Sequence, residues 1–196
     1  MSLKENFYNK MRVRILRFDK IIRYVPKKGK ILDFGCSYGT FSFLMNKENK
    51  NIKITGIDLN AGRIRKAKFR ARKSKNLEFI AGDVTRMEWE NTYDAVTCID
   101  VFHHIPRTYH EKLLKNIFGL IKKNGILILK DMNTRPAYKY YWNFLHDMIM
   151  THSKRMWYTS MEDFQNLLKK QGFKIETGRD ISNSLYAHYL IVAVKP

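Results

Sequence analysis

The sequence predicts an α/β domain in which a mainly parallel β-sheet carries helices on both faces. Apolar runs rich in isoleucine and valine alternate with segments of helical periodicity, as expected when strands and helices follow one another. Several of these runs close on an acidic residue or a glycine, at the strand ends where open α/β sheets bind ligands. With 196 residues and 44% hydrophobic content, the chain suits a single domain over residues 1–196 with a sizeable core.

Residues 1–28 begin the chain with the pattern of a basic amphipathic helix. Apolar side chains recur at spacings of three and four between Leu3 and Val25, and lysines and arginines occupy much of the remaining surface. A helix of this kind packs on the domain with a solvated basic face, or it lies on a membrane or partner surface. Both interpretations are open at this point.

The stretch over residues 30–40 has the pattern of a buried strand, a glycine turn and the start of a helix. An apolar run that contains Asp33 ends at Gly35, and Gly39 precedes a second apolar segment. Glycine allows a positive φ and a close approach of a ligand, and the helix N-terminus offers free N–H groups to an anion. A nucleotide-like ligand is therefore expected. The dinucleotide fingerprint would need glycine at positions 37 and 40, and this chain has serine and threonine there.

A second strand is expected over Ile52–Asp58, and its last residue is acidic. Asp58 follows the glycine turn by about 20 residues, where Rossmann-type folds use a carboxylate to bind the ribose hydroxyls of a nucleotide. The glycine turn and this acid are independent signals, and both indicate the same class of ligand. A strongly basic helix is expected to follow over residues 62–75.

The remaining elements complete a seven-stranded pattern. Further strands are expected at residues 77–84, 93–100, 126–131, 173–181 and 186–194. Amphipathic helices are expected at residues 107–121 and 160–171. Ser160 is the expected N-cap of the second helix, and Asp163 three residues later completes a near capping box.

The order of these motifs resembles a known family. The glycine loop comes first, Asp58 follows the second strand, Asp83 follows the third, and Asp100-Val-Phe-His-His-Ile-Pro106 follows the fourth. Over about residues 28–132, this order resembles the small-molecule ("type 11"-like) branch of the class I S-adenosylmethionine-dependent methyltransferases. The resemblance implies a Rossmann-like, seven-stranded, mostly parallel sheet with an antiparallel last strand, and S-adenosyl-L-methionine as cofactor.

The resemblance also implies a set of cofactor-binding residues. The glycine loop would hold the methionine and ribose parts of the cofactor, and Asp58 would bind the ribose hydroxyls. The ends of the third and fourth strands would contact the adenine and the methionine end. Serine takes the place of the family's usual middle glycine at position 37. The full set is Asp33, Gly35, Cys36, Ser37, Gly39, Asp58, Leu59, Asp83, Val84, Asp100 and Val101.

His103 and His104 are the candidate catalytic residues. A hydroxyl or ammonium-like acceptor must lose a proton to a base, and histidine titrates near neutral pH. In the family, however, one histidine of such a pair often packs structurally. Asp100, Asp131 and Asn133 offer oxygen ligands of the kind that magnesium prefers. Because the surrounding motifs differ from those of magnesium-dependent enzymes, no metal is expected.

The resemblance implies an acceptor-side insertion at residues 133–158, after the fifth of the parallel strands. These residues also hold more aromatic side chains than one buried helix face requires. Tyr141, Trp142, Phe144 and Trp157 are the candidate substrate contacts. They would wall a pocket for a lipid-like or aromatic acceptor, or stack nucleobases beside a basic groove. The alternative is an ordinary helix that covers the sheet.

The formal net charge of +19 favours anionic partners, either nucleic acid bound without specificity or an anionic membrane surface. A lysine-rich proteome is the competing explanation. The segment after the fourth strand lacks the boxes of adenine- and cytosine-methylating enzymes, so a small-molecule or lipid-like acceptor is favoured. An RNA methyltransferase, or a non-catalytic cofactor-fold subunit that docks on RNA or a membrane, is the alternative. A cytoplasmic location is expected, since no signal peptide or apolar span is visible.

Overall fold

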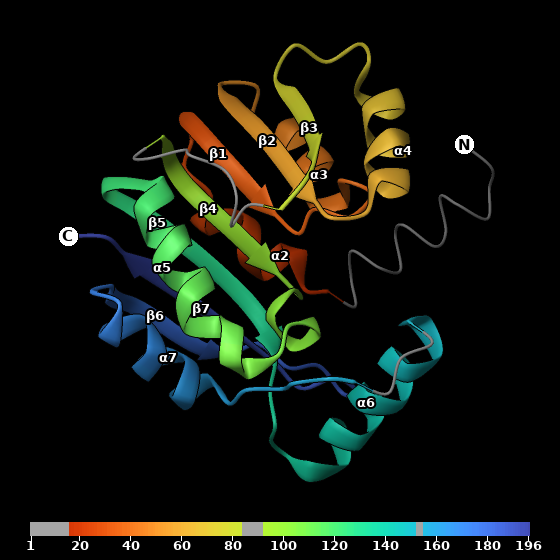
Figure 1. Cartoon of the computed structure of the whole chain (residues 1–196), viewed down its shortest axis with the longest axis vertical. Helices are drawn as coiled ribbons and strands as arrows, with labels where there is room; N and C mark the ends of the chain where they lie inside the picture. The colour runs from red at the N-terminus through yellow and green to blue at the C-terminus, as the bar shows by residue number, and fades with distance from the viewer. Residues whose placement is uncertain (1–15, 84–91, 152–154) are drawn as a thin grey trace.

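The computed structural model describes residues 16–83, 92–151 and 155–196. Within them lies one seven-stranded sheet with the order β3-β2-β1-β4-β5-β7-β6 (Figure 1). The strands are β1 (Gly29–Phe34), β2 (Ile52–Asp58), β3 (Leu77–Ala81), β4 (Tyr93–Ile99), β5 (Ile121–Met132), β6 (Lys174–Asp180) and β7 (His188–Val194). Strands β1 to β5 pair in parallel, while β7 runs antiparallel to both β5 and β6. The predicted mostly parallel sheet with an antiparallel last strand is confirmed.

The helices follow the strands in the alternating order that the sequence pattern predicts. They are α2 (Phe18–Ile21), α3 (Thr40–Glu48), α4 (Ala61–Ala71), α5 (His110–Leu120), α6 (Ala137–Thr151) and α7 (Met161–Lys170). The described residues also contain the 3₁₀ turns η1 (Ile22–Tyr24), η3 (Phe102–His104) and η4 (Arg107–Tyr109). Ser160 caps α7 as predicted, since its hydroxyl accepts a hydrogen bond from the backbone N–H of Asp163 at 3.1 Å.

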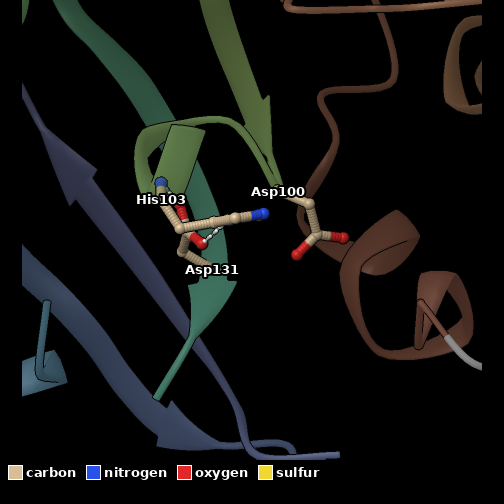
Figure 2. Close-up of side chains that lie close together, drawn as sticks. All are labelled: Asp100, His103 and Asp131. Atoms are coloured by element: carbon tan, nitrogen blue, oxygen red, sulfur yellow. Dashed lines mark hydrogen bonds and ion pairs between the residues drawn. The ribbon is translucent and has the colours of Figure 1, made fainter. Parts of the chain in front are cut away.

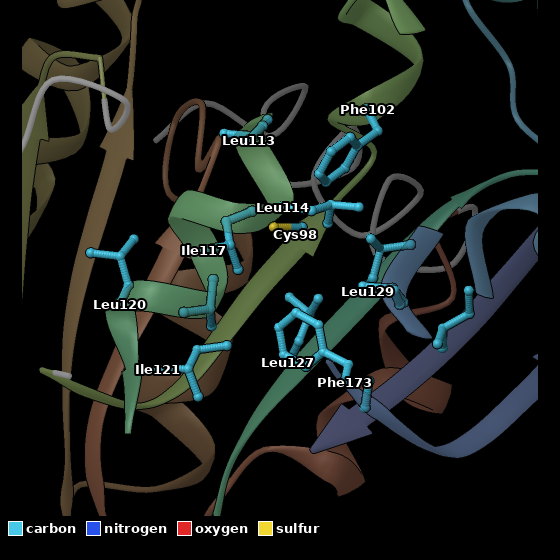
Figure 3. Close-up of a cluster of buried hydrophobic side chains, with 14 of the residues drawn as sticks. Cys98, Phe102, Leu113, Leu114, Ile117, Leu120, Ile121, Leu127, Leu129 and Phe173 are labelled. Carbon is cyan, nitrogen blue, oxygen red and sulfur yellow. The ribbon is translucent and has the colours of Figure 1, made fainter. Parts of the chain in front are cut away.

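Apolar side chains fill both faces of the sheet, so helices cover it on both sides. On one face, α5 and α7 pack over β4, β5 and β7, and Figure 3 shows Leu114 and Ile117 of α5 beside Cys98, Leu127 and Leu129. On the other face, Phe18 and Ile21 of α2 join Phe41 and Met45 of α3 against β1 and β2. The central strands are therefore buried on both sides, as continuous apolar runs predict.

The α4 helix has a narrow buried side against β3 and β2. Ile64, Ala67 and Ala71 lie there with Phe79. Its other positions are largely cationic and exposed. At its N-terminus, the Asn60 side chain accepts a hydrogen bond from the N–H of Arg63 at 3.0 Å, which caps the helix directly after β2.

Two elements differ from the sequence prediction. The part of the expected N-terminal helix that the structure describes is divided, because Arg17 has a left-handed φ of 56° and the short α2 passes into η1. Residues 1–15 of that helix lie outside the described residues. Strand β5 starts at Ile121 rather than residue 126, directly after α5, and pairs Ile121 with Tyr93 across an irregularity in register.

Within the described residues, the longest helices are too short or too polar to cross a bilayer. The described chain has both cysteines, Cys36 and Cys98, as buried free thiols.

Candidate cofactor and active site

The glycine loop joins β1 to α3 at the carboxyl edge of the sheet. Gly35, Ser37 and Gly39 all have positive φ, at 70°, 54° and 73°. A Cβ on Gly35 would lie 2.5 Å from Val101, and one on Gly39 would lie 2.6 Å from Phe79. At both positions glycine is therefore required for two reasons: the positive φ of the backbone and the clash that a Cβ would make. Ser37 adopts the same left-handed region, which explains why the family usually has glycine there.

Asp58 at the end of β2 fixes the loop from the neighbouring strand. One of its oxygens accepts from the backbone N–H of Ser37 at 2.9 Å, and the other accepts from Asn60 at 2.8 Å. Each carboxylate oxygen has a second lone pair, so Asp58 retains acceptor capacity for two vicinal hydroxyls. The side chain is half-buried and is held at the position the sequence predicts for a ribose ligand.

Asp33 lies beneath the loop rather than on its surface. It is 2% exposed, and its oxygens accept hydrogen bonds from Ser42 of α3 at 2.5 Å and from Thr97 of β4 at 2.8 Å. Burial raises the pKa of Asp33 to about 6, against the hydrogen bonds that stabilise the charged form. The carboxyl therefore ties β1 to a helix and a strand, and its contact with the cofactor amino group stays a prediction.

The other predicted cofactor residues gather along the same edge. Leu59 follows Asp58 and is 77% exposed, while Asp83 follows β3 and is half-buried. Cys36 is buried in the loop, and burial raises the pKa of its thiol. Val84 lies outside the described residues. The structure thus brings the ends of β1, β2 and β3 together, as parallel strands require.

Asp100 at the end of β4 forms a buried ion pair that the sequence analysis missed. It has a left-handed φ of 56°, and the ammonium of Lys130 on β5 lies 2.5 and 2.7 Å from its two oxygens. Lys130 is fully buried. Burial raises the pKa of Asp100, although the charge of Lys130 acts in the opposite direction. A lysine within an apolar strand gives no local signal of this partner.

His103 of η3 pairs with Asp131 at the end of β5. Its Nδ1 lies 2.5 Å from one oxygen of Asp131, and the other oxygen accepts from the backbone N–H groups of Phe102 and His103 at 2.9 and 3.3 Å (Figure 2). Burial lowers the pKa of His103, but the charges of Asp131, Asp147 and Asp100 outweigh burial and raise it overall. Burial raises the pKa of Asp131, but the charge of His103 acts in the opposite direction, and the pKa of Asp131 is lowered overall. The two groups therefore favour the charged pair.

The second nitrogen of His103 is also engaged. Nε2 lies 3.7 Å from Asp147 of α6, and Asp147 accepts a hydrogen bond from the Tyr158 hydroxyl at 2.5 Å. The Tyr158 ring stacks on the His103 ring, and the carbonyl of His103 accepts from the N–H of Trp157 at 2.9 Å. His103 is 2% exposed. It therefore joins β5, α6 and the segment after α6, and neither ring nitrogen faces an open site.

His104 has the opposite environment. Its ring lies 4.0 Å from that of His103, centroid to centroid, yet its side chain keeps access to solvent. Desolvation of the ring by the surrounding protein lowers the pKa of His104 to about 4. The charge of His103, and more weakly that of Arg63 on α4, act in the same direction. At neutral pH this imidazole is uncharged and free to accept a proton. The pKa of His103 is thus raised, while the pKa of the adjacent His104 is lowered.

Asp100, His103 and Asp131 also offer three ligand atoms within 4.8 Å of one another. Figure 2 shows the three side chains converging between β4 and β5. The ammonium of Lys130 already contacts Asp100, and the His103 ring already contacts Asp131. A metal ion would have to displace the Lys130 ammonium from Asp100 and the proton held between His103 and Asp131, so this geometry does not favour a metal. The expectation that none is bound stays a prediction.

The predicted acceptor-side residues differ in their exposure to solvent. Phe144 is half-buried, and Trp157 beyond the helix lies half-buried beside His103. Tyr141 and Trp142 are 69% and 43% exposed. Their contact with an acceptor stays a prediction. Two residues beside His103, Asp147 and Tyr158, were missed because nothing local connects them with η3.

Comparison with known proteins agrees with this geometry. The crystal structure of the PH0226 protein from Pyrococcus horikoshii superposes with a TM-score of 0.78 at 24% identity, covering 95% of this chain and 91% of that one. A Burkholderia thailandensis 1,6-didemethyltoxoflavin-N1-methyltransferase with bound S-adenosylhomocysteine superposes with a TM-score of 0.75 at 14% identity, covering 92% and 78%. These superpositions show that the chain has a Rossmann-like fold.

The sequence profile of the methyltransferase domain family matches residues 26–181, so the chain belongs to that family. The carboxy-S-adenosyl-L-methionine synthase of Nautilia profundicola is 27% identical over 148 residues, which are 75% of this chain and 62% of that protein. The ubiquinone biosynthesis O-methyltransferase of Rickettsia akari is 26% identical, over 70% of this chain and 59% of its own length. The chain thus spans less than two thirds of these relatives.

The family identifies S-adenosylmethionine as the cofactor, and the site residues fit it. Gly35 and Gly39 have no side chain, so the cofactor can approach the backbone of the loop. Asp58 retains acceptor capacity at the carboxyl edge of the sheet, and the side chain of Leu59 beside it is an exposed apolar surface. These groups match a ligand with vicinal hydroxyls and an aromatic base.

Proposed function

We propose that this enzyme transfers a methyl group from S-adenosylmethionine to a small-molecule or lipid-like acceptor. The bound cofactor supplies an activated methyl group, so the chain's main task is to align the acceptor with it. The observation that carries the proposal is the glycine loop with Asp58 at the carboxyl edge of the sheet, with the solvent-accessible His104 in η3 directly after β4. His104 is the candidate base for a hydroxyl or an amine acceptor, and its lowered pKa makes it a weak base that suits an acceptor whose proton leaves readily.

His103 is a positioning residue in this proposal. Asp131 and Asp147 face its two nitrogens, so it holds η3 in place and carries positive charge beside His104. Desolvation by the surrounding protein, and then that charge, keep the pKa of His104 low. Tyr158 borders the same histidine through its ring, and Trp157 does so through its backbone N–H.

The nature of the acceptor rests on the segment after β4. Asp100-Val-Phe-His-His-Ile contains neither a Pro-Pro-aromatic box nor a Pro-Cys nucleophile. The relatives include an (S)-coclaurine N-methyltransferase and a ubiquinone biosynthesis O-methyltransferase, whose names indicate small-molecule acceptors. We further infer a cytoplasmic location, which the two reduced thiols support.

The experiment incubates the protein with methyl-labelled S-adenosylmethionine and a cell extract separated into small-molecule, lipid and RNA fractions. We expect label in the small-molecule or lipid fraction, and its loss in Asp58→Ala, which weakens cofactor binding. Label confined to RNA would support the RNA methyltransferase instead. If no fraction is labelled although the cofactor binds, the non-catalytic subunit is the better account.

A further inference from the structure

Helix α6 carries a row of large apolar side chains that the described part of the chain leaves open to solvent. Tyr138, Tyr141, Trp142, Leu145 and Ile149 are 67%, 69%, 43%, 45% and 60% exposed. Their spacing of three and four places them on one face of the helix. We call these five residues the α6 stripe. Half of the large apolar side chains that are exposed in the described structure belong to it.

The α6 stripe lies opposite the face that anchors the helix. Asn143 is buried and donates to the carbonyl of Ala187 at 3.0 Å, and Asp147 is buried against Tyr158. Because successive residues turn by about 100°, positions 143 and 147 point away from positions 141, 145 and 149. The α6 stripe therefore points away from the rest of the domain, while the hydrogen bonds of Asn143 and Asp147 hold the opposite face of the helix. Contiguous exposed apolar surface of this kind marks an interaction site.

Charge indicates which partner covers the stripe. The only acidic residue of α6 is Asp147, which is buried, so the exposed face carries no negative charge. Arg135 is exposed just before the helix, and Lys139 lies in its first turn. A second copy of the chain would bring a net charge of +19 against another +19, which opposes self-association. Leu145 and Ile149 cannot stack on nucleobases, which disfavours RNA.

We propose that the α6 stripe docks on an anionic lipid surface, with the helix lying in the plane of the membrane interface. Tyrosine and tryptophan prefer that interface, and leucine and isoleucine enter the acyl boundary below it. The exposed Arg135 then faces the lipid phosphates, whereas the ammonium of Lys139 donates to the carbonyl of Asn183 at 2.6 Å. The positive field of the chain adds attraction. The proposal is independent of the methyl acceptor.

Vesicle sedimentation of the full chain tests this proposal. Phosphatidylcholine vesicles that contain phosphatidylglycerol should bind the protein, and pure phosphatidylcholine should bind it less. Ile149→Gln should weaken the partition about five- to tenfold, because it removes one apolar side chain from the acyl boundary. Tyr109→Gln is the matched control, since Tyr109 is also 60% exposed but lies in η4, and it should bind like the wild type.

A second measurement does not depend on how well a glutamine variant folds. Brominated phosphatidylglycerol should quench tryptophan fluorescence of the wild type, and Trp142→Phe should lose most of this quenching. Equal vesicle binding by Ile149→Gln and Tyr109→Gln, or quenching unchanged in Trp142→Phe, would overturn the proposal. So would a change in the solution mass of the free protein on Ile149→Gln, which would make the stripe an interface between copies.

Discussion

Single buried ionisable residues set the chemistry of this site, and Asp33 is the clearest case. The carboxyl has two hydroxyl donors and yet has its pKa raised to about 6 by burial. Because its folded pKa exceeds the unfolded value of 3.8, the folded state binds more protons between these values. The stability contribution is therefore complete below about pH 4 and is lost as the pH rises through about 6.

Asp33→Asn should remove this pH dependence. The amide stays neutral, and the hydroxyl that faces its NH2 group can turn to accept, while the other hydroxyl still donates to the amide oxygen. Relative to wild type, the variant should gain up to about 3 kcal/mol of unfolding free energy near pH 7, and little near pH 4. Urea unfolding at several pH values measures the difference. Parallel stability curves for the two proteins would show that Asp33 does not titrate as described.

His104 gives a second prediction at this scale, in the pH dependence of turnover. A base with its pKa lowered to about 4 is already deprotonated at neutral pH, so kcat should stay level from about pH 8 to about pH 6. His104→Ala should lower kcat by about 10²-fold or more, the usual contribution of a general base, with cofactor affinity nearly unchanged. An inflection near the ordinary histidine value, which His104→Ala abolishes, would contradict the assigned environment.

At the residue scale, sequence reasoning found the groups whose role is local. Gly35 and Gly39 are recognisable because a positive φ leaves few alternatives to glycine. Asp147 and Tyr158 were missed, because their contacts with His103 bridge more than 40 residues and no spacing rule connects them. The separate environments of His103 and His104 have the same cause, since the partner carboxylates come from β5 and α6.

At the scale of elements, Gly39 and Gly119 are a matched pair for mutation, because only the first lies where a Cβ would clash. Gly39 starts α3 with a φ of 73°, and a Cβ there would lie 2.6 Å from the buried Phe79 ring. Gly119 lies inside α5, and a Cβ there would meet nothing within 4 Å. The first position excludes a side chain and the second accepts one.

Gly39→Ala should therefore destabilise the protein by about 1–3 kcal/mol, through overpacking and the left-handed backbone, and weaken cofactor binding. Gly119→Ala should stabilise it by about 0.5–1 kcal/mol, since alanine is the better helix former. Thermal melts compare the two variants with the wild type. Similar stability for both would mean that Gly39 is not constrained as the structure indicates.

Helix and strand identities were predictable from periodicity, whereas their ends were less so. The 52–58 strand and the Ser160 cap agree with the structure because alternation and capping are local properties. The cations and glycine at residues 122–125 indicated a helix end and a later strand start, but pairing with β4 carries β5 back to Ile121. Tertiary pairing overrode the local signal there.

At the scale of the whole molecule, the net charge of +19 predicts salt-sensitive and non-specific binding of RNA. Each neutralised phosphate releases counterions, so affinity falls steeply as salt rises. Arg65, Lys68 and Arg72 are exposed on α4 or directly after it. Replacing all three with glutamine should reduce the magnitude of the log–log salt slope by about 2 for single-stranded RNA.

The matched control replaces Lys112, Lys115 and Lys169, which are exposed on α5 and α7. Filter binding at several salt concentrations measures both triple variants. An equal change in both would show that the charge acts as a diffuse field rather than through α4. Sequence-selective binding that persists at high salt would contradict the non-specific interaction and favour an RNA acceptor.

We expect the carboxyl edge of the sheet to bind S-adenosylmethionine through the glycine loop and Asp58. Calorimetric titration with S-adenosylhomocysteine tests it most directly, with NAD as the competing nucleotide and Asp58→Ala as the variant. We expect a dissociation constant on the order of micromolar for S-adenosylhomocysteine and no measurable binding of NAD. Asp58→Ala should lose about 1.5–3 kcal/mol of binding free energy, the worth of hydrogen bonds to a charged group. Binding of NAD, or full affinity in Asp58→Ala, would contradict the account.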